Sequence, residues 1–378
     1  MVSNNCNFEV VNEISIVEKN ISIMKNTIKI IAFTAFAAML TWGCSKNSGP
    51  ESKLSLKDAM SQSAQDLNTA VDVIASSKAF TIFTMKEGLL KSDNPGDSTF
   101  RVYIPLEKIK GVYDFKPVKK FDLFGMSLIK YFKKTDDNSR MIVRMPLEKV
   151  TNPRSLRHYS DKDTSLVNNF TISVSDYHNN FNGFWDYDYA LASEISIDNE
   201  VAGNLKIKSL VSPKKRIDYA SQYAFTGSYT ADYVMQSGDT ASSSFSISGG
   251  GKVLYEEKLL SVKNDTSLFH RERQYILTVG DVQITRNSST RKVEVRVNGV
   301  LQPNAVVTIV DRESDDEASV CKKRDIQITF EDGTTTTVSA LIGKSIDNIK
   351  TLFESLHQVY FAANVVDWIA YDIYFNRS

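Results

Sequence analysis

Hydrophobic and polar residues alternate along much of the second half of the chain, as they do in strands with one buried and one wet face. Between Arg291 and Val297, the valines at every second position alternate with charged residues. Asn298-Gly299 follows, and this dipeptide is a strong signal for a two-residue hairpin turn. The pattern predicts a strand, a tight turn and a returning strand over 300–310, which Pro303 interrupts.

Glycine-containing turns also separate other strand-like runs, with no helical pattern between them. These turns are Gly280-Asp281 between 275–279 and 282–285, Asp332-Gly333 between 326–330 and 334–338, and Gly249-Gly250-Gly251 between 244–248 and 253–260. Short turns between consecutive strands indicate antiparallel pairing rather than a parallel α/β sheet. We therefore expect an α+β, β-rich fold, with a large curved antiparallel sheet that forms a meander or a half-barrel.

Two amphipathic helices are predicted, one near each end of the folded region, and both are expected to pack on the sheet. Residues 55–74 place apolar side chains at spacings of three, four and seven, and Ser55 with Asp58 forms a variant of the capping box. Residues 345–360 have the same spacing. Beyond them, 365–375 fits a strand and a helix equally well.

An internal repeat relates residues 101–109 to residues 142–150. Each copy has an extended apolar run followed by Pro-Leu-Glu-Lys and an apolar residue, with an Asp/Asn-rich turn upstream. Because a residue before proline is pushed towards extended conformations, each copy predicts a strand that leaves a sheet edge through its proline. A duplicated binding motif is one interpretation, and a duplicated hairpin explains the pattern with fewer assumptions.

The region around Met24 to Cys44 has the order of parts that is typical of an export signal. Lys25 and Lys29 are followed by an apolar run over 30–40, which is too short to span a bilayer. The run ends in Leu-Thr-Trp-Gly-Cys, and a small residue directly before a cysteine at this place resembles the lipobox of bacterial lipoproteins. The resemblance implies cleavage before Cys44 and attachment of lipid to its sulfur, although Trp42 departs from the usual small residue.

This resemblance organises the chain into four parts: a mis-annotated leader over 1–23, a signal peptide over 24–43, a polar tether over 44–54, and a folded region over 55–378 with a sub-boundary near 190–200. The Asn/Lys/Ser-rich composition resembles that of Bacteroidetes lipoproteins. In those proteins, a run of acidic residues after the cysteine marks export to the outer surface. Here that run is missing, which favours an outer-membrane anchor that faces the periplasm.

Net charge argues against nucleic acid as a partner. The chain carries 45 basic and 45 acidic residues, and removal of residues 1–43 takes three of each. The mature chain would keep no net positive charge for phosphate binding.

The mature chain would also keep one cysteine besides Cys44, namely Cys321, so an intrachain disulfide is not expected. Cys321 lies among charged residues, and we interpret it as a bystander in a solvated loop rather than a nucleophile.

Motifs for catalysis or metal binding are weak in this sequence. Gly343-Lys344-Ser345 occupies the place of a phosphate-binding loop, but Val338 replaces the glycine that such a loop requires. A glycine turn with a serine N-cap is the preferred interpretation. The four histidines show no metal-ligand spacing, and the acidic residues near His158 and His178 are typical of polar turns. We expect no cofactor, no bound metal and no catalytic residue.

The segment 176–189 is the strongest candidate for ligand binding, because it combines six aromatic residues with Asn and Asp. Tyr177, Trp185, Tyr187 and Tyr189 could stack on sugar rings while the polar residues bind hydroxyl groups. The same residues suit a strand whose aromatic side chains fill the core. Trp185, Tyr187 and Tyr189 share one parity, which favours a single buried face.

These features together predict a membrane-anchored, non-enzymatic binding or scaffold protein of the cell envelope. A lipid or another hydrophobic molecule is the first expected ligand class, because a curved sheet under a helix can enclose an acyl chain. A surface protein that binds glycans through 177–189 is the alternative. A hydrolase with an unrecognised site is the third hypothesis. The membrane is the expected partner, through the lipid on Cys44.

Overall fold

The computed structural model describes residues 55–84, 101–116, 131–151, 165–183, 186–212, 216–263, 271–312, 323–343, 345–356 and 360–376. Residue contacts divide the chain into two compact units. Among the described residues, one unit holds residues up to Thr69 together with Lys252–Ile346, and the other holds Ala70–Gly251 together with residues from Asp347 onward. The predicted leader, signal peptide and tether lie outside the described residues and stay predictions.

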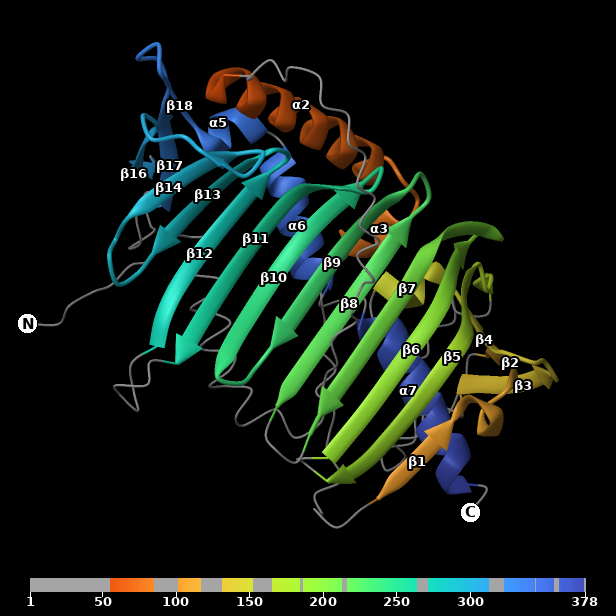
Figure 1. Cartoon of the computed structure of the whole chain (residues 1–378). Helices are drawn as coiled ribbons and strands as arrows, with labels where there is room; N and C mark the ends of the chain where they lie inside the picture. Colours follow the sequence, from red (N-terminus) through yellow and green to blue (C-terminus); the bar gives the residue numbers. More distant parts are fainter. Residues whose placement is uncertain are drawn as a thin grey trace, which may run out of the picture. The chain divides into compact units, whose positions relative to one another are not determined.

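The larger unit, Ala70–Gly251 with the C-terminal residues, contains ten strands in one sheet (Figure 1). The strands are β1 Val102–Pro105, β2 Gly111–Phe115, β3 Phe132–Asp136, β4 Met141–Met145, β5 Phe170–Gly183, β6 Asp186–Ile197, β7 Glu200–Val211, β8 Ile217–Phe225, β9 Tyr229–Gln236 and β10 Thr240–Gly249. From β5 to β10 each strand pairs antiparallel with the next one in the chain. This meander confirms the predicted β-rich class and its main topology.

The first strands depart from the purely antiparallel order that the sequence predicted. β2 lies between β3 and β4, and it pairs parallel with β4. The sheet is therefore mixed, and the two strands flanking the Asp/Asn-rich turn at 135–138 do not form a hairpin. The interpretation of the second repeat copy as a hairpin is wrong, because β2 takes the position between its two strands.

The two repeat copies nevertheless have the same structural role. β1 and β4 both pair antiparallel with β5, at 178–181 and 170–174 respectively. β1 ends at Pro105 and β4 ends at Met145, just before Pro146. Each is followed by a short helical segment, η1 Leu106–Lys108 after β1 and α4 Leu147–Thr151 after β4. The repeat is thus a strand followed by a helical turn, used twice along one side of β5.

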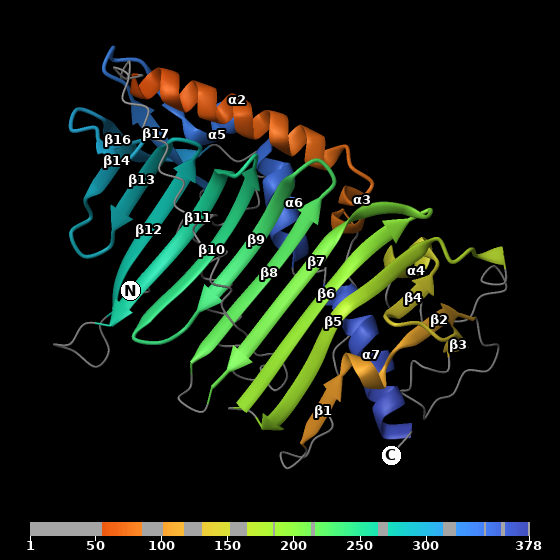
Figure 2. The ribbon, with the colours of Figure 1, turned by 45° about the vertical axis from the view of Figure 1, so that its right-hand side comes forward.

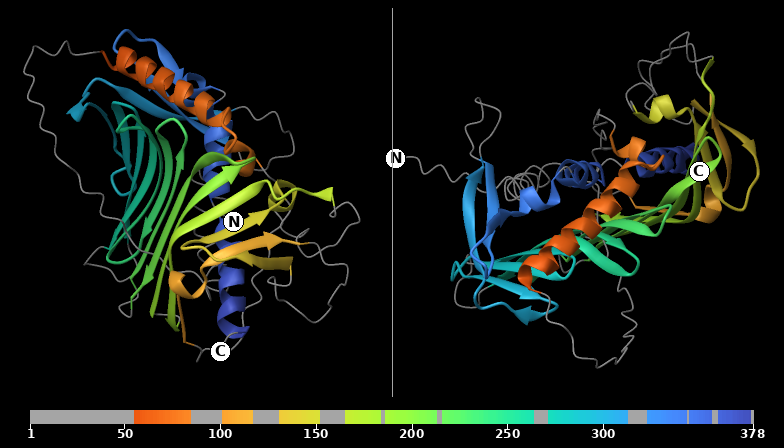
Figure 3. Two further views of the ribbon diagram at one scale, coloured as in Figure 1. Left: turned by 90° about the vertical axis from the view of Figure 1, so that its right-hand side faces the viewer. Right: turned by 90° about the horizontal axis from the view of Figure 1, so that it is seen from above.

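Helices cover one face of this sheet. α3 Phe80–Phe83 places Phe83 edge-on to Tyr223 of β8, with ring centroids 5.0 Å apart. α6 Ser345–Leu356 places Phe353 against Tyr233 and Phe245, at 6.1 and 5.3 Å. α7 Tyr360–Asn376 lies along one side of the strands near β1, β5 and β6 (Figure 2 and Figure 3). The ambiguous segment 365–375 is therefore a helix.

A one-residue bulge in β5 decides which of its side chains face the helices. Val174 pairs with Ser193, and Asp176 pairs with Ala192, so Ser175 is the extra residue. Before the bulge the even-numbered side chains are buried, and after it Tyr177 and Asn179 are buried instead. A bulge shifts the two-residue period of a strand by one position. Without it, His178 would take the buried side.

The smaller unit contains the strands and turns that the sequence predicted over 252–338. Its strands are β11 Lys252–Lys263, β12 Arg271–Val279, β13 Val282–Asn287, β14 Val293–Val297 and β15 Val300–Leu301 in antiparallel succession, and β16 Val306–Arg312, β17 Lys323–Thr329 and β18 Thr335–Thr337 in a separate sheet. Asn298 and Gly299 both have positive φ, as a two-residue hairpin turn requires. Pro303 lies where the chain leaves β15 and enters the second sheet, so the run over 300–310 is two strands.

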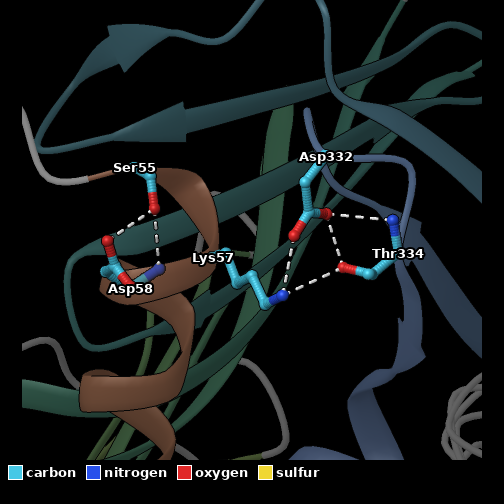
Figure 4. Close-up of polar contacts among 5 residues, drawn as sticks. All are labelled: Ser55, Lys57, Asp58, Asp332 and Thr334. Atoms are coloured by element: carbon cyan, nitrogen blue, oxygen red, sulfur yellow. Dashed lines mark hydrogen bonds and ion pairs between the residues drawn. The ribbon is translucent and has the colours of Figure 1, made fainter.

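The start of α2 Leu56–Ala75 is fixed to the smaller unit by polar contacts (Figure 4). Ser55 Oγ accepts from the Asp58 amide at 3.1 Å and donates to the Asp58 carboxylate at 2.7 Å, which confirms the predicted capping box. Lys57 Nζ donates to Asp332 at 2.8 Å and to Thr334 at 3.2 Å. Both acceptors belong to the turn between β17 and β18, so this turn holds the first turn of α2.

Further along α2, Ser63 contacts the turn between β12 and β13. The Asp281 amide donates to Ser63 Oγ at 3.1 Å, and a Cβ on Gly280 would come within 2.5 Å of the same oxygen. Gly280 also has positive φ. The predicted Gly-Asp turn is therefore confirmed, and its glycine is needed both for the backbone conformation and for the close approach of the helix.

Two other predicted features fall on described elements. Gly343 ends α5 Val338–Ile342 with positive φ, and Ser345 begins α6, so the segment is a turn between two helices. The helix α5, and not a strand, directly precedes Gly343, unlike the arrangement of a phosphate-binding loop. The sub-boundary predicted near 190–200 falls within the paired strands β6 and β7 of one unit.

We predict that Gly203→Ala destabilises the larger unit by about 1–3 kcal/mol, the usual cost of overpacking a core. A Cβ at this position would lie 2.5 Å from the Ala224 carbonyl oxygen and 2.6 Å from the ring of Tyr223. Urea unfolding would measure the change. Asn204→Ala, at the next and exposed position, should stay within about 0.5 kcal/mol. Equal midpoints for the two variants would contradict the close packing of β7 on Tyr223.

Candidate functional site

A single carboxyl group and a set of tyrosines meet on the helix-covered face of the larger unit. Asp367 and Tyr371 lie four residues apart on α7, so both occupy the same side of the helix. Tyr177 comes from β5, beyond the bulge, while Tyr187 and Tyr189 come from β6. We call these five residues, together with Asn179 of β5, the Asp367 cluster.

The three tyrosine rings that the strands contribute to the cluster are buried and contact one another. Tyr177, Tyr187 and Tyr189 are 2%, 8% and 5% exposed. Tyr177 and Tyr189 meet edge to face with centroids 5.9 Å apart, and Tyr187 and Tyr189 are stacked at 6.2 Å. Such arrangements are favourable for aromatic pairs in a core. These contacts agree with the interpretation that tyrosines of segment 176–189 form a buried face.

The cluster is held to α7 by a hydrogen bond across the helix–sheet interface. Tyr177 Oη donates to Asp367 Oδ1 at 2.9 Å. The Asn179 side chain interacts with the Tyr371 hydroxyl and lowers its pKa, although burial dominates and leaves that pKa raised. Asp367 keeps part of its surface accessible, whereas Asn179 is almost completely buried. Asp367 is therefore less completely buried as a residue than Asn179 and the tyrosines that face it from the sheet.

Burial changes the protonation of these groups. It raises the pKa of Asp367 to about 7, although the hydroxyls of Tyr177 and Tyr189 act to lower it. Burial also holds the pKa values of Tyr177, Tyr187 and Tyr189 well above the ordinary range, and the Asp367 carboxylate adds to this effect. Near neutral pH, the tyrosines are neutral and Asp367 is divided between its two forms.

Several buried polar atoms on the covered face have no hydrogen-bond partner. Asn179 Oδ1, Tyr189 Oη and Ser209 Oγ are all in this state. The three residues occupy directly paired positions across β5, β6 and β7, so they form one row on the covered face. The Tyr189 hydroxyl still influences the pKa of Asp367, but its geometry is not that of a normal hydrogen bond. A buried polar atom without a partner is costly, by about 1–3 kcal/mol, and calls for an explanation.

The structure brings together three of the four aromatic residues proposed from the sequence. Tyr177, Tyr187 and Tyr189 belong to the cluster, while Trp185 lies outside the described residues. Because these tyrosines are buried, they do not offer an exposed stacking platform for sugar rings. Cys44 and Cys321 also lie outside the described residues, and their predicted roles stay predictions.

Sequence reasoning missed Asp367, Asn179 and Tyr371. The sequence did hold one sign of a buried carboxyl, because Asp367 directly follows Val365 and Val366 in a segment with few charged residues. The ambiguity between helix and strand hid it, because a strand would place Val365, Asp367 and Ile369 on one side, whereas a helix separates Asp367 from both apolar residues. The pairing of Asn179 with this group also required the bulge at Ser175, which leaves no clear mark in the sequence.

The remaining candidate chemistry does not join this cluster. His178 Nε2 lies 3.1 Å from Asp188 Oδ1, on side chains that alternate with the buried ones and so belong to the opposite face of the sheet. His158, His270 and His357 fall outside the described ranges. In the described part of the chain, no three His, Cys, Asp or Glu residues gather as metal ligands. Within that same part, no helix is long and apolar enough to cross a membrane.

Comparisons with family models, curated proteins and solved structures give no match to this chain.

The buried carboxyl predicts a pH dependence of stability that Asp367→Asn should remove. Its pKa is about 7 in the folded chain and near 4 when unfolded, so folding takes up a proton between these values. Stability should therefore fall as pH rises from about 4 to 7, by roughly 2–4 kcal/mol, and then level off. The variant stays neutral and should be the more stable protein at pH 8.

Thermal or urea unfolding of both proteins at pH 5 and pH 8 would measure this difference. The tyrosines that face Asp367 remain neutral over this range because their pKa values are raised. Asp188→Asn, on the opposite face, is the matched control and should keep the wild-type dependence. A variant at Asp367 that is less stable than the wild type at pH 8 would show that the carboxylate is a net stabiliser.

Proposed function

We propose that the protein is a non-enzymatic, lipid-anchored binding protein of the bacterial cell envelope, attached to the outer membrane on its periplasmic side. The lipobox-like sequence before Cys44 supports the anchor. Residues 45–54, which are mostly polar, would separate the lipid from α2, whose first turn is fixed by Lys57 to the smaller unit. The tether would therefore lead into a helix whose first turn is held in place on the folded region.

The observation that carries the binding role is the row of unpaired polar atoms on the covered face. A core that served only for packing would pair its polar atoms or replace them with apolar groups. Here Asn179 Oδ1, Tyr189 Oη and Ser209 Oγ are buried and unpaired in one row across the covered face, and Asp367 interacts with Tyr189 of this row. A bound molecule that donates hydrogen bonds would complete them. The surrounding apolar and aromatic side chains favour a ligand with a hydrophobic body.

The same groups favour binding over catalysis. General acid–base chemistry needs groups that exchange protons near the working pH, and nucleophilic catalysis needs a nucleophile beside a base. The tyrosines of the cluster have pKa values far above neutrality, so they act as neutral hydrogen-bonding groups. Asp367 has a suitable pKa, but its nearest partners are these tyrosines. We therefore assign the cluster the recognition of a polar group on an amphiphilic ligand.

Native mass spectrometry of the protein purified from its own host tests this role. We expect a population with an extra noncovalent mass, besides the mass of lipid attached to Cys44, because a buried ligand with several hydrogen bonds should survive purification. Tandem dissociation would release the molecule for identification. Tyr189→Phe, which deletes one unpaired hydroxyl, should reduce the bound fraction. Uniformly ligand-free protein from gentle extraction would argue against the binding role.

The anchor has a separate test. The wild-type chain should incorporate labelled palmitate and sediment with membranes, because the lipid chains partition into the bilayer. Cys44→Ser should carry no label and should either stay unprocessed or leave the membrane fraction. Cys321→Ser is the matched control and should behave as the wild type. A wild-type protein that never takes up palmitate would exclude the lipid anchor.

A further inference from the structure

Two unpaired oxygen atoms and one carboxyl group indicate which chemical group of a ligand the cluster would bind. Asn179 Oδ1 can only accept hydrogen bonds, and it is left without a donor while the Asn179 side chain interacts with Tyr371. Tyr189 Oη lies directly across the strand pair and also lacks a partner. Asp367 adds a negative charge when it is ionised. The group that fits these atoms must donate several hydrogen bonds and carry positive charge.

We propose that Asp367, Asn179 and Tyr189 together receive a primary ammonium group of the bound ligand; this inference rests on the proposed binding function. An ammonium group has three N–H donors, which match the Asn179 and Tyr189 oxygens and the Asp367 carboxylate. Its charge would keep the carboxylate ionised in a buried setting. The neighbouring tyrosine rings add a favourable surface for a cation.

Other occupants fit these residues less well. Calcium takes six to eight oxygen ligands and usually several carboxylates, whereas the cluster offers one. Magnesium also demands a near-ideal octahedral set of oxygens. An anionic group would face a carboxylate and several oxygen acceptors. A buried water molecule could pair with some of these atoms, but it would leave the carboxylate charge uncompensated.

The residues of the cluster differ in how completely they are buried. Asp367 and Tyr371 keep part of their surfaces accessible, while Asn179 and Tyr189 are almost fully buried. A terminal ammonium group would therefore approach from the side of Asp367 and Tyr371, the least buried residues of the cluster, while the rest of the ligand stays outside or along the apolar surface. An ethanolamine phospholipid and a free alkyl amine both carry such a group.

The test uses the full lipoprotein in nonionic detergent and isothermal titration calorimetry with two pairs of probes. n-Butylamine is compared with n-butanol, and mixed micelles of short-chain phosphatidylethanolamine are compared with those of phosphatidylcholine. n-Butylamine differs from n-butanol in both its positive charge and its N–H donors, whereas phosphatidylethanolamine differs from phosphatidylcholine mainly in its N–H donors. We expect n-butylamine and phosphatidylethanolamine to bind at pH 8 at least tenfold more tightly than their partners. Binding of phosphatidylethanolamine alone would identify the lipid as the source of the ammonium group.

Variants separate recognition by the cluster from general attraction to the protein. Asp367→Asn should weaken the binding of the amine probes at least tenfold, and Tyr189→Phe should weaken it severalfold. Asp188→Asn removes a carboxylate from the opposite face and should change the affinity less than twofold. Circular dichroism and the melting temperature would show that each variant is folded. Tyr189→Phe keeps the inference testable even where Asp367→Asn alters folding.

The possible failures are distinguishable. Equal binding of phosphatidylethanolamine and phosphatidylcholine would overturn the ammonium inference and leave the proposed binding of a hydrophobic ligand intact. Equal affinity of wild type and Asp367→Asn for n-butylamine would also overturn it, because the amine would then bind without the Asp367 carboxylate. Absence of binding to every probe, together with ligand-free protein in native mass spectrometry, would remove both the inference and the proposed function.

Discussion

Helices and a long antiparallel sheet hold the larger unit together by burying alternate side chains along most of β5 to β9. Because this alternation has a period of two, a single added residue exchanges the buried and the wet face. The bulge at Ser175 makes this exchange within β5. It allows the first half of the strand to bury Ile172 and Val174, while the second half turns Tyr177 and Asn179 towards α7. The position of every strand-borne group of β5 near Asp367 depends on that one residue.

The covered face is unusual in relying on tyrosine. A buried tyrosine contributes a large apolar ring, but its hydroxyl needs a partner. Tyr177 finds one in Asp367, whereas the hydroxyls of Tyr189 and Tyr223 remain unpaired. Small residues make room for the rings, as Gly203 does for Tyr223. Shape complementarity is therefore well satisfied on this face, while hydrogen bonding is incomplete, and the incompleteness is concentrated on β5 to β8.

Local sequence predicted the features that local geometry decides. The turns at Gly280-Asp281 and Asn298-Gly299 follow from residues that tolerate positive φ, and the capping box at Ser55 follows from side chains three residues apart. The parallel pairing of β2 with β4 could not be predicted in this way, because both strands have ordinary apolar runs and their order depends on distant partners.

The part of the candidate site that the strands contribute could be predicted from local sequence, and the part that α7 contributes could not. The tyrosines of segment 176–189 were visible as a cluster of aromatic residues in one stretch of sequence. Their carboxyl partner was not, because Tyr177 and Asp367 are separated by 190 positions. Parity within β6 placed Tyr187 and Tyr189 on a common face, and the structure confirms that face as buried. Which group lies opposite them is a property of the folded chain, set by how α7 packs on the strands.

The energetics of Asp367 connect stability with function. Burial that raises the pKa of a carboxyl to about 7 lowers the stability of the folded chain at neutral pH, relative to a neutral side chain of the same shape. The unpaired oxygens of Asn179 and Tyr189 add to this loss. Groups that lack partners lower the stability of the ligand-free protein, and a ligand that pairs with them gains that interaction energy on binding. A cationic donor that enters the cluster would recover both contributions at once, because it compensates the charge and completes the hydrogen bonds. The same residues that weaken the empty protein would then provide the affinity of the complex.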